Sequence, residues 1–243
     1  MPKLKVRSLK FKLTRENKAF SITERSAKLF SVKTIPVVLW SSDFPLNYKP
    51  GLKTIFYLVL GLFLFGLGDA IIIGSGAGVS PWTVLAQGVS NFTDWTIGFS
   101  TFIVSLSVLI LWFPLKQQPG IGTILNVIII AGTIDLTLPY LPSPNEYPYQ
   151  ILQAAVGILA IGLGSGFYLA ANLGPGPRDG LMVGLQKKTD LPIVTVRTAL
   201  EFTVVISGWM MGGLVGLGTV MFVFGIGPSV AGGLYLVGIL FRR

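Results

Sequence analysis

Two short segments decide the fold: PWTVLAQGVSNF at residues 81–92 and PRDGLMVGLQKK at residues 177–188. Each begins with proline, follows a glycine-rich stretch and lies between two long apolar stretches. A helix of this length extends roughly 18 Å at about 1.5 Å per residue, whereas the hydrocarbon core of a bilayer is about 30 Å thick. These segments are therefore predicted to be helices that are too short to cross a membrane.

The two segments occupy equivalent positions in an internal repeat. A shift of 96 residues aligns residues 61–123 with residues 157–219 without a gap, with 16 identities in 63 positions. A register that includes glycine, proline, threonine and aspartate is not expected from apolar composition alone, and it indicates a duplication. The identities include Gly66-Leu67-Gly68 with Gly162-Leu163-Gly164, Pro81 with Pro177, and Thr93-Asp94 with Thr189-Asp190.

The composition is that of a membrane protein. Of the 243 residues, 51% are hydrophobic and only 12% are charged, whereas soluble domains carry about 25% charged residues. Each half contains three apolar stretches long enough to span a bilayer. We therefore predict an all-α membrane protein with six transmembrane helices, at about 54–73, 97–113, 120–138, 152–173, 192–211 and 218–241.

The distribution of Lys and Arg predicts how the two halves are oriented. If the short segments crossed the membrane, each half would have four spans, and Lys116 and Arg178 would face outward. If they are re-entrant, each half has three spans, the second half is inverted, and the loop bases lie on the side of the basic N-terminal tail. Because loop bases are cytoplasmic, we predict two inverted three-helix repeats, each with a short re-entrant half-helix. The predicted boundaries are a cytoplasmic tail over 1–53, a first repeat over 54–138, an external loop over 139–150 and a second repeat over 151–243, with both termini cytoplasmic.

Most of the positive charge lies in the tail. Residues 1–53 hold 12 of the 19 Lys and Arg residues and three acidic residues. One interpretation is a polybasic arm that binds anionic lipid headgroups, and the other is a tail whose charge only sets the orientation. Because the excess lies in one tail, nucleic-acid binding is not predicted. An apolar patch at 35–40 is too short to span the bilayer, and we expect Trp40 to lie at headgroup level.

The half-helices supply a candidate binding site. A helix start carries a partial positive charge and unpaired N–H groups, so two opposed starts at the midplane suit an anion or the negative end of a dipolar solute. Arg178 would add charge, and Trp82 would offer an aromatic wall. The alternative is that glycine and proline only allow these helices to pack closely. The candidate substrate-binding residues are Ser80, Pro81, Trp82, Gly176, Pro177, Arg178 and Asp179.

Four charged residues lie within the predicted spans: Asp69, Asp135, Arg197 and Glu201. A charge in lipid is costly, so each is expected to face the interior or a partner. In one interpretation Glu201 or Asp69 accepts a proton or cation and couples it to transport. In the other, Arg197 and Glu201 form a satisfied internal pair four residues apart, while Asp69 and Asp135 lie near the external surface.

The missing residue types argue against catalysis. The chain has no Cys and no His, which excludes thiol nucleophiles and removes the commonest metal ligand and general base. No cofactor and no metal site are predicted, and the protein is not expected to be an enzyme.

Several motifs resemble the YczE/YyaS/YitT-type bacterial membrane proteins. The resemblance covers about residues 54–241 and implies a bacterial inner-membrane location but little chemistry. The segment SPWTVL at 80–85 resembles the Pro-Trp motif of these proteins, although the family often has Asp where this chain has Thr83. The other motifs are LGPGPRDGLM at 173–182, VRTALE at 196–201, Gly216-x-Gly218-Thr219 and Gly227-Pro228.

We therefore expect a small secondary transporter or channel-like permease. Its solute is expected to be a small molecule, with anions among the candidates, and to bind between the half-helix starts. The alternative is a membrane scaffold or regulator that acts through the basic tail. Glycine spacings such as Gly162-x-x-x-Gly166 suit close helix contacts, either inside one chain or between copies in a homo-oligomer.

Overall fold

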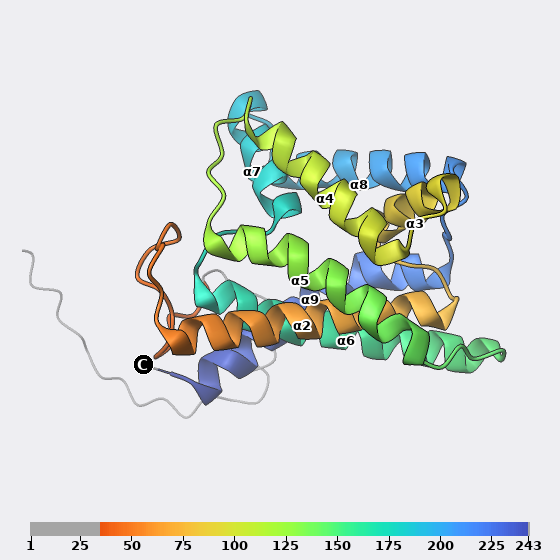
Figure 1. Cartoon of the computed structure of the whole chain (residues 1–243), viewed down its shortest axis with the longest axis horizontal. Helices are drawn as coiled ribbons and strands as arrows, with labels where there is room; N and C mark the ends of the chain where they lie inside the picture. The colour runs from red at the N-terminus through yellow and green to blue at the C-terminus, as the bar shows by residue number, and fades with distance from the viewer. Residues whose placement is uncertain (1–34, 243) are drawn as a thin grey trace, which may run out of the picture.

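The computed structural model describes residues 35–242, so the predictions for residues 1–34 and Arg243 lie outside the described part of the chain. Within that part the protein is all-helical (Figure 1). The helices are α2 (Leu52–Ser75), α3 (Pro81–Thr93), α4 (Ile97–Trp112), α5 (Ile121–Thr137), the 3₁₀ turn η1 (Leu138–Tyr140), α6 (Tyr147–Ala171), α7 (Pro177–Thr189), α8 (Ile193–Met210) and α9 (Leu217–Leu240).

The 96-residue offset of the sequence repeat recurs in the helix boundaries. The short helices α3 and α7 both have 13 residues, and they begin at Pro81 and Pro177. Both end in a left-handed aspartate, Asp94 and Asp190. The starts of α4 and α8, and of α5 and α9, are offset by the same number. The predicted helix starts are confirmed, with Ser80 as the N-cap of α3 and Gly176 as that of α7.

Among residues 35–242, five helices are long and apolar enough to span a membrane, where the sequence predicted six: α2, α5 with η1, α6, α8 and α9. A sixth span results only if α3 and α4, which are bent by 114° at their junction, are taken together. The helix α4 alone has 16 residues, fewer than the roughly 20 that a span needs. It ends at Trp112 because Pro114 follows, and proline cannot donate the next helical hydrogen bond.

Two helices begin earlier than the predicted boundaries. The helix α2 starts at Leu52, inside the predicted tail, after the extended residue Gly51. The helix α6 starts at Tyr147, inside the predicted loop over 139–150, with Pro148 in its first turn. Proline suits this position because its φ angle is already helical and its missing N–H would have no partner.

The helices form two layers, each containing elements of both halves (Figure 1). In one layer α6 packs against α2 and α9, and α2 also packs against α5. In the other layer α3, α4, α7 and α8 form a ring in which each helix contacts two others. The short helix of each half packs against a long helix of the other half, α3 on α8 and α7 on α4.

The contact between α2 and α6 is antiparallel and reciprocal. A β-carbon on Gly61 would lie 2.7 Å from the carbonyl oxygen of Gly164, and one on Gly68 would lie 2.7 Å from that of Gly157. Gly157 is the repeat equivalent of Gly61, and Gly164 is that of Gly68, so the two contacts exchange when the halves are exchanged. Each of these close contacts therefore has a counterpart at the equivalent positions of the other half.

The glycine spacing in α6 serves contacts inside the chain. A β-carbon on Gly162 would lie 2.5 Å from the carbonyl oxygen of Ser229 in α9, and one on Gly166 would lie 2.5 Å from the carbonyl carbon of Gly233. Small residues at this spacing let two helix backbones approach closely. Of the two interpretations of this motif, internal packing is therefore the one found.

The loops that precede the two short helices are held by equivalent hydrogen bonds in the two halves. The backbone N–H of Gly218 donates to the Ala77 carbonyl, and that of Gly122 donates to the equivalent Leu173 carbonyl, both at 2.8 Å. Gly78 and Gly174 have φ angles of 106° and 109°, which residues with a β-carbon rarely adopt. The two short helices thus begin from equivalent, fixed positions.

Trp40 is buried among side chains of the protein, so it does not have the exposed position in the interface that was expected from the sequence. Its side chain is 5% exposed and stacks on Tyr57, with ring centroids 4.5 Å apart. The segment before α2 runs against the end of α6, where the Ser41 hydroxyl donates to the Ala170 carbonyl at 2.6 Å. This carbonyl belongs to the last turn of a helix and otherwise lacks an intrahelical donor. Ser41, directly after the patch, therefore caps the end of α6.

Candidate functional site

The starts of α3 and α7 meet at equivalent residues. Trp82 and Arg178 are both the second residue of their helices and are related by the 96-residue offset. The guanidinium carbon of Arg178 lies 5.4 Å from the centre of the Trp82 ring, within the distance of a cation–π interaction. This contact joins equivalent positions of the two halves. Both helix starts therefore face the same central region.

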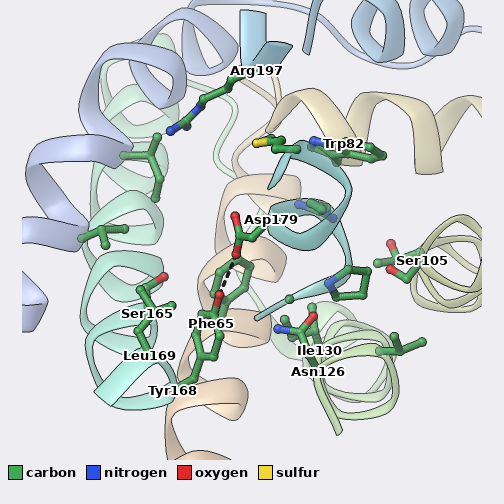
Figure 2. Close-up of a pocket in the computed structure, with 18 of the residues that line it drawn as sticks. Phe65, Trp82, Ser105, Asn126, Ile130, Ser165, Tyr168, Leu169, Asp179 and Arg197 are labelled. Atoms are coloured by element: carbon green, nitrogen blue, oxygen red, sulfur yellow. Dashed lines mark hydrogen bonds between the residues drawn. The ribbon is translucent and has the colours of Figure 1, made fainter. Parts of the chain in front are cut away.

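A cavity of about 270 Å³ lies at this junction (Figure 2). Each of the α-helices in the described part of the chain, α2 to α9, contributes residues to its wall. The lining combines apolar side chains with about as many residues that carry polar or charged groups. The polar and charged lining residues are Thr101, Ser105, Asn126, Ser165, Tyr168, Arg178, Asp179, Arg197 and Glu201, together with Trp82.

Two of the acidic residues at the cavity already have partners. The Tyr168 hydroxyl donates to Asp179 Oδ2 at 2.8 Å, as Figure 2 shows. Glu201 Oε1 accepts from Arg197 Nε at 2.8 Å. The predicted pairing of Arg197 with Glu201 is confirmed, but the pair lies at the cavity, and the Arg197 side chain is 48% exposed.

Two hydrogen-bond donors at the junction lack acceptors. Among the described residues, none accepts a hydrogen bond from the Arg178 guanidinium, although Arg178 lines the cavity. The indole N–H of Trp82 is buried and also has no partner in the described part of the chain. An unpaired buried donor is costly, and native proteins rarely leave one without a reason.

Asp69 lies beside this junction in the protein interior. The residue is 2% exposed, and its Oδ2 has no hydrogen-bond partner among residues 35–242. The groups that act on its carboxyl are the charge of Arg178 and the hydroxyl of Thr83. A carboxylate buried to this degree needs a compensating charge, and Arg178 supplies it.

The two halves place a carboxyl group beside their short helix in different ways. In the first half the carboxyl is Asp69 on α2, and it faces Thr83 on α3. In the second half the equivalent of Asp69 is Ser165, and the equivalent of Thr83 is Asp179. Each half therefore brings one carboxyl group to the start of its short helix. In the first half it comes from the long helix, and in the second half from the short helix itself.

The structure brings most predicted site residues together, but not all of them. Trp82, Gly176, Pro177, Arg178 and Asp179 line the cavity, as do Arg197 and Glu201. Ser80 and Pro81 are buried outside its wall, and the Ser80 hydroxyl lies 2.7 Å from that of Thr83.

Asp135 belongs to a different contact. Its Oδ2 accepts from the Thr96 hydroxyl at 2.6 Å, and its Oδ1 accepts from the Gly98 N–H at 2.8 Å. These bonds hold the start of α4 on α5. Asp135 therefore has a structural role that the sequence interpretations did not include.

The second half lacks this clamp between its corresponding helices. Val194 and Ala231 stand where the first half has Gly98 and Asp135. The helix α4 packs along α5, whereas within the described residues α8 makes at most marginal contact with α9 (Figure 1). Because Arg197 and Glu201 of α8 and Phe222 of α9 all line the cavity, the cavity is bounded on this side by two separated helices.

Several cavity residues were not predicted. Tyr168 and Asn126 are single polar residues in long apolar helices, which by itself is a weak signal. Thr101 and Ser105 could have been found, because the 96-residue offset relates them to Arg197 and Glu201. Within residues 35–242, no group of three or more acidic side chains is arranged to hold a metal ion.

Comparison with known proteins finds relatives whose names assign no activity. The model described as "Family of unknown function (DUF6198)" matches residues 52–232. An uncharacterized protein of Haemophilus influenzae is 42% identical over 82% of this chain and 90% of its own length. The uncharacterized membrane protein YczE of Bacillus subtilis is 34% identical over 70% of this chain and 80% of its own length. The protein YyaS of the same organism is 26% identical over 68% of this chain and 84% of its own length. No solved structure matches the chain.

Proposed function

Because the chain belongs to the DUF6198 family of unknown function and is similar to the uncharacterized membrane protein YczE, we propose its function from the site: a small transporter or channel-like permease. The observation that carries the proposal is the central cavity, into which Arg178 projects without a hydrogen-bond acceptor among the described residues. A guanidinium without a hydrogen-bond acceptor inside a helical membrane protein is a candidate marker of the pathway of a polar solute. The protein is proposed to move this solute without chemical change.

The proposed membrane arrangement is two inverted repeats with re-entrant half-helices. Its support is the antiparallel, reciprocal contact of α2 with α6, because two neighbouring spans that run in opposite directions belong to oppositely oriented halves. The helices α3 and α7 have 13 residues, about 20 Å, and end short of the opposite face. With the basic tail inside the cell, both termini are cytoplasmic, and the membrane is the bacterial inner membrane.

The proposed solute site lies between the two half-helix starts. Gly176 and Pro177 bring the α7 backbone to the cavity wall, and Arg178 and Trp82 form the polar and aromatic sides of the site. Ser80 and Pro81 do not line the site; they position it, because Ser80 caps α3 and Pro81 is its first residue. The gap between α8 and α9 is the proposed entrance in this conformation.

The second candidate function is a scaffold or regulator that acts through its tail. The observation in its favour is the concentration of 12 of the 19 basic residues in positions 1–53, which suits anionic lipid headgroups. A scaffold needs no solute access to the cavity from both sides of the membrane. This difference separates the two functions without knowledge of the solute.

Cysteine accessibility tests the proposal, because the natural chain has no Cys. The Ser105→Cys variant places one thiol in the cavity wall. We expect an anionic, membrane-impermeant methanethiosulfonate to modify it from either side of sealed proteoliposomes, because a transporter exposes its site alternately to both sides. The matched control is Ser100→Cys on the same helix, at a fully buried position outside the cavity wall, which should stay unmodified.

Modification of Ser105→Cys from one side only, or from neither, would contradict the transport proposal. Deletion of residues 1–34 is expected to leave the modification unchanged. If the deletion alone abolishes the protein's effect in cells while the cavity stays closed to one side, the scaffold function is favoured.

A further inference from the structure

We propose that the cavity takes a small organic monoanion together with one proton, with Arg178 binding the anion and Asp69 accepting the proton. This inference rests on the proposed function, since it names the solute class and the coupling ion of the same site. It makes the protein a proton–anion cotransporter.

Arg178 is the cation at the cavity whose guanidinium has no hydrogen-bond acceptor among the described residues, so its N–H groups are available to an anion. The other cation in the wall, Arg197, is already paired with Glu201 at 2.8 Å. Arg178 donates no hydrogen bond to any described residue, and it lies against the Trp82 ring. A planar guanidinium held against an aromatic face keeps its edge available for the two oxygens of a carboxylate or sulfonate. The start of α7 adds its partial positive charge at the same place.

The rest of the cavity suits a compact apolar body. Its volume of about 270 Å³ limits the solute to a small molecule. Among the described lining residues, no cation other than Arg178 lacks a partner. An anion with one charged group and a ring or short hydrocarbon body fits these features. The apolar lining residues are Phe65, Val127, Ile130, Leu169, Met182, Phe222, Ile226 and Val230.

The charges around Arg178 explain why a proton should enter with the anion. Arg178 is subject to the charges of Asp69, Asp179 and Glu201, with the Tyr168 hydroxyl also near it. Two carboxyl groups, those of Asp69 and Asp179, face the single positive charge of Arg178. When both are ionised, the group of three is already negative overall, and an added anion would make it more negative. A net charge in the membrane interior is costly. One proton removes the excess that the anion brings.

Asp69 is the carboxyl group best placed to take that proton. Asp179 accepts a hydrogen bond from Tyr168, and Glu201 accepts one from Arg197, and such bonds stabilise the ionised form. Asp69 Oδ2 accepts none within the described residues. The groups acting on Asp69 are Arg178 from α7 and the Thr83 hydroxyl from α3. When Asp69 is neutral, Arg178 loses one counter-charge and attracts an external anion more strongly.

Titration with benzenesulfonate tests the inference on the full chain in lipid nanodiscs. This probe stays anionic at every pH used, so any pH dependence of binding belongs to the protein. We expect wild-type affinity to rise as the pH falls, approaching tenfold per pH unit where one proton accompanies each anion. The uncharged benzenesulfonamide and the cation benzylammonium should not bind. Arg178→Gln should weaken benzenesulfonate binding at least tenfold.

The Asp69→Asn variant should bind benzenesulfonate independently of pH, and at high pH more tightly than the wild type. The matched control is Asp135→Asn, which removes another intramembrane carboxyl outside the cavity wall and should keep the wild-type slope. If Asp69→Asn fails to fold, the protons taken up on wild-type binding are counted by calorimetry in two buffers of different ionisation enthalpy. We expect about one proton per anion.

Tight, pH-independent binding to the wild type would overturn the coupling and leave the transport proposal standing. Binding of benzylammonium or of zwitterionic phenylalanine in place of benzenesulfonate would overturn the anion class. Absence of any binding would overturn the inference as a whole, and two-sided modification of Ser105→Cys would then still support transport of another solute class.

Discussion

Replacing Gly68 with valine is expected to prevent correct assembly of the helix bundle. Even a β-carbon at this position would lie 2.7 Å from the Gly157 carbonyl oxygen and 2.8 Å from the Ile161 nitrogen. Both atoms belong to the α6 backbone, so no side chain can move to make room. Overpacking usually costs about 1–3 kcal/mol, and a contact that forces two helix backbones apart should exceed this range.

The measurement is the yield of monodisperse protein in detergent and its thermal unfolding midpoint. Gly132→Val is the matched control, because a β-carbon on Gly132 would meet nothing within 4 Å. Gly164 is the repeat equivalent of Gly68 and faces the α2 backbone, so Gly164→Val should be comparably damaging. Wild-type yield and midpoint for Gly68→Val would contradict the reciprocal contact between α2 and α6.

Replacing Trp112 with alanine is expected to loosen α7 from α4. Trp112 is 2% exposed, and its indole N–H donates to the Pro177 carbonyl at 2.9 Å. Its ring fills the space left by Gly180, where a β-carbon would collide with the ring. Removal of a buried tryptophan costs about 3–5 kcal/mol, and here it also frees the start of the helix that carries Arg178.

The thermal unfolding midpoint measures this loss, with Trp209→Ala as the control because Trp209 is exposed on α8. Trp112→Phe keeps an aromatic ring but loses the donor, so its midpoint should lie between those of the wild type and Trp112→Ala. Equal midpoints for Trp112→Ala and Trp209→Ala would show that Trp112 does not anchor α7.

Much of the architecture could be predicted from the sequence because the repeat has no gap. Pro81 and Pro177 mark helix starts through local backbone chemistry, and that chemistry survives in the folded chain. The length of α4 was harder to predict, because a single proline after Phe113 shortens an otherwise continuous apolar stretch. The burial of Trp40 could not be predicted either, since it depends on contacts with helices distant in the sequence.

The candidate site was predictable where each residue acts through its own helix. Arg178 is the second residue of a short helix whose start the sequence marks with proline. Arg197 and Glu201 are four residues apart on one helix, a spacing that predicts an ion pair. The partnership of Tyr168 with Asp179 and the position of Asp69 depend on how separate helices pack. The weak contact between α8 and α9 goes with the replacement of Gly98 and Asp135 by Val194 and Ala231, and this link is visible only once the helices are placed.

The central claim is that the two halves cross the membrane in opposite directions, and paired cysteine labelling tests it directly. Phe92 and Lys188 are repeat equivalents, both are exposed near the ends of the short helices, and each can carry the only thiol of the chain. Single-cysteine variants are treated with an impermeant maleimide in right-side-out and in inside-out membrane vesicles. We predict that Phe92→Cys reacts only in right-side-out vesicles and Lys188→Cys only in inside-out vesicles. Reaction of both variants in the same vesicles would contradict the opposed orientation.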